Sequence, residues 1–136
     1  MNTTPSNPEI ELVEVGPRDG LQNEPDAGLP DVPDATYIGL ALNKRGVLRG
    51  LETRVGGKRG IDQVGCVIVA SDTFGQKNQG QTIAEGIAEN REMIRFAKAE
   101  GMSAQITISA AYGCPFEGEV EPEAVLAIAE EVAAKG

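Results

Sequence analysis

The chain contains no histidine, no tryptophan and only two cysteines among its 136 residues. Without histidine it lacks the side chain that most often serves as a general base or as a ligand of a transition metal. Cys66 and Cys114 lie far apart and lack the paired spacing of a zinc site, which excludes a zinc-binding module. Cys66 lies in an apolar run, so we predict that it is a small residue of the core.

Long apolar runs are also missing, and aromatic residues make up only 4% of the chain. No apolar stretch approaches the ~18 residues that a transmembrane helix needs, and no signal-peptide pattern is present. We therefore expect no membrane partner. Free cysteines without a disulfide framework are typical of a reducing compartment, so we also expect a cytoplasmic location.

Basic residues are few, and the net charge is -9. Because phosphate binding depends on Lys and Arg, nucleic acid is not an expected partner. Half of the basic residues nevertheless lie between positions 44 and 59, which predicts either one solvated helix face or an attractor for an anionic ligand. These residues are Lys44, Arg45, Arg49, Arg54, Lys58 and Arg59.

The arrangement of apolar residues predicts alternating strands and helices. Such alternation favours an α/β fold with a parallel sheet and right-handed crossovers. Residues 1–8 are polar and are expected to form a flexible N-terminus, whereas 9–136 are expected to form one domain. Strands are predicted at 10–15, 36–42, 64–70 and 103–110, helices at 43–55, 82–100 and 121–135, and polar loops at 16–34, at 71–80 and after 110.

Three polar loops follow predicted strands, at the edge where parallel α/β folds bind ligands. The first loop contains Arg18 and Asp19. A carboxylate in that position could hold a divalent cation, and the adjacent guanidinium could stabilise an oxyanion. Judged by themselves, the residues fit a simple Arg-Asp-Gly turn with a local ion pair better than a cation site.

Three segments resemble the 3-hydroxy-3-methylglutaryl-CoA lyases, within the metallolyase group related to isopropylmalate synthases. They are GPRDGLQNE at 16–24, ASDTFGQKNQGQT at 70–82 and ISAAYGCPFEGEVEPEAV at 108–125. The Gly-Cys-Pro-Phe-Glu-Gly run in the third segment separates these lyases from the synthases. The likeness covers about residues 9–24 and 36–136. It implies a partial (β/α)₈ TIM barrel in which parallel strands alternate with helices and about half of the barrel is present.

The resemblance also implies roles for residues of the first loop. Asp19 would be a metal ligand, and Arg18 would be a catalytic, substrate-binding group beside the thioester oxygen. Gln22 would line the same pocket. The implied reaction is a retro-Claisen cleavage of 3-hydroxy-3-methylglutaryl-CoA to acetyl-CoA and acetoacetate, which depends on Mg²⁺ or Mn²⁺ and belongs to leucine degradation.

Three further residues match family positions near the mouth of the barrel, and we assign them no catalytic role. They are Ser71, Asn78 and Cys114. For Cys114 the simpler interpretation is a thiol that packs in its loop beside Pro115. Glu117 is expected to be structural or solvated.

The chain also departs from the family. A short Pro-rich bridge joins Glu24 to Tyr37, where the family has a βα unit of ~30 residues or more, so we infer an internal deletion. The family's His-x-His metal ligands have no counterpart. One carboxylate cannot supply the roughly six contacts that Mg²⁺ or Mn²⁺ requires, so we expect negligible lyase activity from this polypeptide alone.

An open half-barrel would leave two sheet edges and an apolar inner face exposed. We therefore expect self-association, or a partner that completes the barrel. Two other functions stay open at this point. The chain could be a related metallolyase aldolase or synthase that acts on 2-oxo acids, or a non-catalytic remnant that binds CoA-like anions through residues 44–59.

Overall fold

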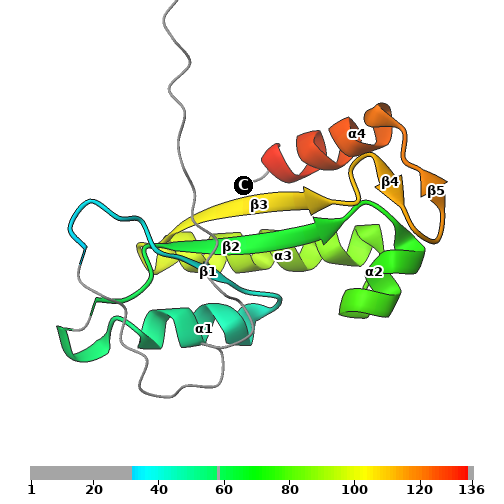
Figure 1. Ribbon diagram of the computed structural model, residues 1–136. Coiled ribbons are helices and arrows are strands. Elements are labelled where there is room, and N and C mark those ends of the chain that lie inside the picture. Colours follow the sequence, from blue (N-terminus) through cyan, green and yellow to red (C-terminus); the bar gives the residue numbers. More distant parts are fainter. Residues whose placement is uncertain (1–31, 58, 135–136) are drawn as a thin grey trace, which may run out of the picture.

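A computed structural model describes residues 32–57 and 59–134 of the chain. Its centre is a sheet of three parallel strands in the order β1-β2-β3, shown edge to edge in Figure 1. The parallel strands confirm the predicted α/β class. The strand predicted at 10–15 lies outside the described residues. The three strands are β1 (Ile38–Leu40), β2 (Gln63–Val69) and β3 (Ser103–Ser109).

Helices connect the strands and pack on one face of the sheet. The longest of them, α3, packs against β2 and β3, and Figure 1 shows it running behind them. A short antiparallel hairpin of β4 (Gly113–Cys114) and β5 (Gly118–Glu119) follows β3. The helices are α1 (Lys44–Glu52), the 3₁₀ helix η2 (Val55–Gly57), α2 (Asp72–Gln79), α3 (Ile83–Ala99) and α4 (Pro122–Ala133).

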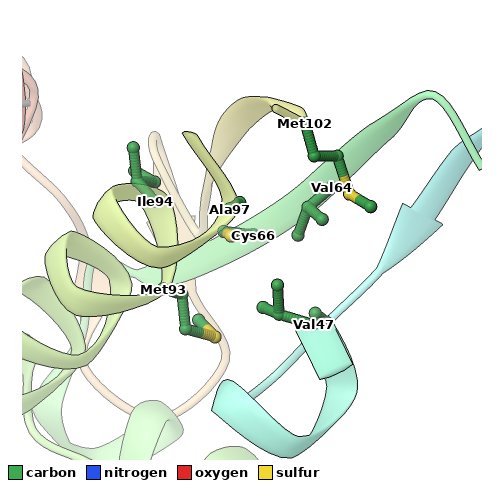
Figure 2. Packing of buried hydrophobic residues seen from close by; sticks show 8 residues of the cluster. Val47, Val64, Cys66, Met93, Ile94, Ala97 and Met102 are labelled. Carbon is green, nitrogen blue, oxygen red and sulfur yellow. The ribbon is translucent and has the colours of Figure 1, made fainter. Parts of the chain in front are cut away.

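The core lies between the sheet and the helices. Alternate residues of β2 point toward α3, because side chains of a strand alternate between its two faces. Val64, Cys66 and Ile68 are each at most 1% exposed. Figure 2 shows one cluster of this core, formed by Ala41, Val47, Val64, Cys66, Met93, Ile94, Ala97 and Met102. The predicted core role of Cys66 is thus confirmed, and its burial raises the pKa of the thiol to about 11.

One polar side chain, that of Asn90 on α3, is buried in this layer with 2% exposure. Its amide nitrogen donates to the carbonyl oxygen of Val67 on β2 at 3.2 Å and to that of Gly86 at 2.7 Å. Its amide oxygen has no hydrogen-bond partner among the described residues. Asn90 therefore ties α3 to the backbone of the central strand.

The opposite face of the sheet agrees with the prediction on β1 and β2, where it carries Ile38, Leu40, Val67 and Val69, and differs from it on β3. We predicted an apolar inner face, but on β3 this face carries Ser103, Gln105 and Thr107, all of them exposed. Strict alternation with Ala104, Ile106 and Ile108 turns the apolar side chains of β3 toward the helices. The prediction was wrong for β3 because it ignored the alternation of polar and apolar residues in this strand, which places the polar ones on the inner face.

The prediction of a loop at 71–80 is also wrong, because most of this segment forms α2. Ser71 caps the start of this helix, since its side chain accepts a hydrogen bond from the amide of Phe74. Gly80 ends the helix in the left-handed conformation, with φ of 71°. The segment has only one large apolar residue, Phe74, so hydrophobic periodicity could not detect it. The capping residues at both ends were the available signal.

We predict opposite effects for two Gly→Ala changes within helices. A Cβ atom at Gly75 would lie 2.5 Å from the backbone oxygen of Gln81, whereas at Gly86 the nearest atom is 3.8 Å away. Gly75→Ala should lower the free energy of unfolding by about 1–2 kcal/mol. Gly86→Ala, the matched control, should raise it by up to about 1 kcal/mol, because alanine favours helix. Urea denaturation of both variants measures the difference, and equal shifts would contradict the packing of α2.

Candidate functional site

The loops that leave β2 and β3 meet at the carboxyl edge of the sheet. β2 is followed by Ala70 and Ser71, and the amide of Ala70 donates to the carbonyl oxygen of Ser109 at 2.9 Å. Ala110 then adopts a left-handed conformation with φ of 55°. This conformation is costly for a residue with a Cβ atom, and it turns the chain out of β3 toward the hairpin. Both loops are therefore held at one edge.

Ser71 and Cys114 are in contact at this edge although 43 residues separate them. The Ser71 hydroxyl oxygen lies 3.0 Å from the Cys114 sulfur, and the two residues are 1% and 6% exposed. The amide of Phe116 donates to the same sulfur at 3.4 Å. Ser71 therefore has two structural contacts, because it also caps α2.

The environment of Cys114 favours its thiolate. Burial alone would raise the pKa of the thiol, but hydrogen bonds to the sulfur outweigh that effect. They come from Ser71 and from the backbone amides of Phe116 and Glu117, so the pKa lies below its ordinary value. Cys66, which is buried without such donors, shows the opposite shift.

The β4–β5 hairpin docks on the first two turns of α2. The rings of Phe74 and Phe116 are 5.8 Å apart between centroids, and the Lys77 ammonium lies 4.1 Å from the centre of the Phe116 ring. The carboxylate of Glu117 accepts a hydrogen bond from the amide of Thr73 at 2.7 Å. Glu117 thus satisfies an amide at the start of α2, where a negative charge is favourable.

Comparison with known proteins gives a consistent set of relatives. No family profile matches the chain. The cytoplasmic 3-hydroxy-3-methylglutaryl-CoA lyase of Danio rerio is 27% identical over 160 residues, which is 90% of this chain and 48% of that protein. The (R)-citramalyl-CoA lyase of Chloroflexus aurantiacus is 29% identical over 168 residues, 89% of this chain and 53% of that protein.

Solved structures agree with these relatives. The hydroxymethylglutaryl-CoA lyase of Pseudomonas aeruginosa superposes with a TM-score of 0.70 at 29% identity, covering 81% of this chain and 35% of the other. The lyase of Acinetobacter baumannii in complex with coenzyme A and 3-methylmalate gives 0.70 at 27% identity, over 80% of this chain and 33% of the other.

The chain is a relative of the hydroxymethylglutaryl-CoA lyases. The resemblance found in its three loops is confirmed, and its fold is part of their TIM barrel. The chain spans about half the length of the curated relatives that it matches. The match to the mitochondrial lyase of Rattus norvegicus is 173 residues long yet takes in all of this chain, so it exceeds the 136 residues present by 37. That excess agrees with the inferred internal deletion.

The lyase-like loops bring together two of the six predicted site residues. Ser71 and Cys114 are in contact, as described above. Asn78 is exposed on the last turn of α2, roughly 10 Å of helix rise from Ser71. The three residues of the first loop lie outside the described residues. These three are Arg18, Asp19 and Gln22.

Four residues at this edge were not singled out from the sequence. The aromatic contact between α2 and the hairpin and the Glu117–Thr73 hydrogen bond depend on α2 being helical, which the sequence analysis missed. Only the capping pattern of α2 could have suggested them. The four residues are Thr73, Phe74, Lys77 and Phe116.

The basic cluster at 44–59 is mostly occupied by intramolecular contacts. Arg59 forms an ion pair with Asp62 at 2.6 Å, and the guanidinium of Arg54 donates to the carbonyl oxygen of Ile61 at 2.7 Å. Both contacts lie just before β2 begins, at the end of the sheet opposite Ser71. The Lys44 ammonium lies 4.7 Å from the centre of the Phe96 ring. Of the cluster members that the structure describes, Lys44, Arg45 and Arg49 are exposed.

Replacement of Ser71 by alanine should raise the pKa of the Cys114 thiol, because it removes a hydrogen bond that favours the thiolate. Thiolate ultraviolet absorbance, followed against pH in a Cys66→Ala background, reports Cys114 alone. Ser71→Thr, which keeps a hydroxyl, is the control and should leave the midpoint near that of the parent. An unchanged midpoint in Ser71→Ala would show that the contact does not affect the thiol.

The Glu117 carboxylate should contribute to stability above its unfolded pKa, because its hydrogen bond from Thr73 lowers the pKa of the folded state. This contribution is lost as the pH falls through the folded pKa. We expect Glu117→Gln to be less stable than the wild type at neutral pH, with the two stabilities converging in acid. Urea unfolding across this pH range measures the effect. Glu119→Gln, which removes the same charge from the same hairpin, should not reproduce the convergence.

Proposed function

We propose that the protein provides part of a carbon–carbon lyase of the hydroxymethylglutaryl-CoA lyase type. The reaction would be the cleavage of 3-hydroxy-3-methylglutaryl-CoA to acetyl-CoA and acetoacetate. The observation that supports it most is that lyases of this kind match 89–94% of the chain. The Ser71–Cys114 contact, at the edge of the sheet where such barrels bind ligands, supports the same assignment.

The substrate class that we propose is an acyl-CoA thioester of a hydroxy acid. A solved relative contains coenzyme A and 3-methylmalate, which are a thiol carrier and a hydroxy acid. Another relative is named for citramalyl-CoA, so the acyl group varies among proteins of this kind. We choose the hydroxymethylglutaryl group because that name recurs among the curated relatives and the solved structures.

Arg18 would lie beside the thioester oxygen and Gln22 would line the pocket. In the cleavage, the substrate hydroxyl loses its proton, the carbon–carbon bond breaks, and the electrons move onto the thioester oxygen as an enolate, which is then protonated. Arginine suits this position because its charge does not titrate away. One fixed donor at a developing oxyanion contributes about 2.7–4 kcal/mol to lowering a barrier.

We include a divalent cation, Mg²⁺ or Mn²⁺, in this proposal, and Asp19 is the one residue that we propose as its ligand. Within 32–57 and 59–134, no group of three or more His, Cys, Asp or Glu side chains is placed to hold a metal ion. The described residues therefore do not fit a cation on their own, and we assign none of them to one. Asp19 would need ligands from elsewhere to complete a coordination shell of roughly six.

The described residues near the site would act as supports. The Ser71–Cys114 contact joins the loop after β2 to the hairpin after β3, and Glu117 joins the same hairpin to α2. Loops fixed in this way hold a ligand pocket in one shape, which lowers the ordering cost of binding. We propose no step of the reaction at Cys114.

Two alternatives remain as proposals. A related aldolase or synthase that acts on 2-oxo acids would use the same edge of the barrel. A non-catalytic protein that binds CoA-like anions would use the basic cluster. The structure lends the second alternative little support, because Lys44, Arg54 and Arg59 are engaged with neighbouring groups of the chain.

The cytoplasmic location and the single domain at 9–136 also remain proposals. Relatives include both cytoplasmic and mitochondrial lyases. Among the helices within the described ranges, none is long and apolar enough to cross a membrane. A role in leucine degradation follows from the proposed substrate.

We expect the purified 136-residue chain alone to show negligible turnover of 3-hydroxy-3-methylglutaryl-CoA, because it contains no histidine and one predicted carboxylate ligand. Binding is the more informative measurement. In calorimetry, Mn²⁺ should tighten binding of 3-hydroxy-3-methylglutaryl-CoA but not of coenzyme A, because only the former has an acyl group that offers a hydroxyl and a carboxylate to the cation.

Asp19→Asn is the control for this experiment and should abolish the effect of Mn²⁺ while leaving binding of coenzyme A unchanged. Binding of coenzyme A without any effect of the metal would favour the non-catalytic alternative. Absence of binding by either ligand, or rapid turnover by the isolated chain, would contradict the proposal as stated.

A further inference from the structure

The outer edge of β1 carries backbone groups that β2 does not use. The amide of Ala41 donates to a carbonyl oxygen of β2 at 2.8 Å, and the carbonyl oxygen of Tyr37 accepts from the first amide of β2 at 3.1 Å. Successive residues of a strand direct these groups to opposite sides, so the amides and carbonyl groups of Ile38 and Leu40 point away from β2. Among the described residues β1 pairs with β2 alone, so no described strand uses these groups.

Apolar side chains beside this edge are left partly uncovered by the described residues. Leu40 of β1 and Leu42, just after it, are 47% and 45% exposed. A strand laid along β1 would bury part of both side chains and would supply partners for the open backbone groups. The edge therefore suits a strand better than a helix, which pairs its backbone groups within itself.

Residues 10–15, Ile-Glu-Leu-Val-Glu-Val, are the strand that the sequence predicts ahead of β1. Side chains alternate between the faces of a strand, so each face of this segment carries two apolar residues and one glutamate. Such a pattern suits a strand that is covered on both faces, as in the wall of a barrel. The inferred internal deletion removes the βα unit that would stand between this segment and β1, so the two become neighbours.

The connectivity of the sheet selects the edge and the direction of the added strand. The strands β1, β2 and β3 follow one another in one direction, with the connecting helices on one face (Figure 1). A strand that precedes β1 keeps the same right-handed connection only if it lies at the free edge of β1 and runs parallel to it. The connection 16–37 is longer than the roughly 12 residues that a parallel crossover requires, and far longer than a hairpin loop of about 2–5 residues.

A segment of the same chain is also favoured over a second copy as the occupant of this edge. The connection holds residues 10–15 near β1 at an effective concentration of about millimolar. A second copy reaches such a concentration only in very concentrated solution.

We propose that residues 10–15 pair as a parallel strand with the outer edge of β1 and so close the gap left by the deletion. Neighbouring strands lie about 4.8 Å apart, so the loop with Arg18 and Asp19 follows a strand that is roughly 10 Å to the side of β2, which leads into Ser71. An intervening strand would make this lateral separation roughly 14 Å. The pairing therefore brings the predicted metal ligand toward the Ser71–Cys114 contact. It goes beyond the proposed reaction and does not depend on it.

Amide hydrogen exchange in the full chain, followed by NMR, tests this pairing. The amides of Ile38 and Leu40 should be protected, although no described strand accepts from them. In Leu12→Pro/Val13→Pro, two adjacent prolines remove an amide directed at β1 whichever register holds, so the amides of Ile38 and Leu40 should exchange more than about tenfold faster. The amide of Ala41 bonds to β2 and should stay protected, which verifies that the sheet is folded.

Asn2→Pro/Thr3→Pro is the matched control, because it adds two prolines outside 10–15 and should exchange like the wild type. Nuclear Overhauser contacts between residues 10–15 and β1 in the wild type give a second measurement that needs no variant.

Three outcomes would overturn the proposal: exchange of Ile38 and Leu40 at the rate of an unstructured chain, absence of the Overhauser contacts, or an equal loss of protection in the control. Protection that rises with protein concentration would overturn it as well, because it would identify a second copy as the occupant of the edge. No ligand enters this test, so its failure is distinct from a failure of the lyase proposal in calorimetry.

Discussion

The parallel pairing of β2 with β3 is the constraint on which the rest of this structure depends. Seven residues of each strand pair in register, from Gln63 with Ser103 to Val69 with Ser109. Because both strands end at the same level, the loops that follow them start side by side. The contact between Ser71 and Cys114 is a direct result of this register, since a slip of one residue would turn every side chain of β3 to the other face.

The same register divides the two faces of the sheet by chemistry. On one face, Cys66 and Ile106 are partners and contribute to the core beneath α3. On the other face, Gly65 pairs with Gln105, and the side chains of β3 are polar. The polar groups of this face lie mainly on β3, because β1 and β2 place apolar side chains beside them. The register sets Ile38, Val67 and Val69 on the same face as Ser103, Thr107 and Ser109.

The sequence was sufficient to predict the elements that are long and strongly patterned. The apolar run at 64–70 matches β2 to within one residue at each end, and the stripe containing Ile87 and Ile94 matches α3. Helix α2 was missed because it is short and has few apolar residues to bury. Its capping residues are therefore a clearer sequence signal than its hydrophobic periodicity. The joining of the hairpin to α2 could not be predicted, since it depends on contacts between residues about 40 positions apart, such as Thr73 and Glu117.

Asn90 illustrates how such a layered structure avoids ambiguity. A helix that packs on a sheet through aliphatic side chains alone has several arrangements of similar energy, related by a shift of one turn. The amide of Asn90 reaches the carbonyl oxygen of Val67 in only one of them, and any other arrangement would leave the buried amide with only its hydrogen bond to Gly86 of the same helix. Asn90 therefore fixes the position of α3 on the sheet, and it contributes more to the uniqueness of the fold than to its stability.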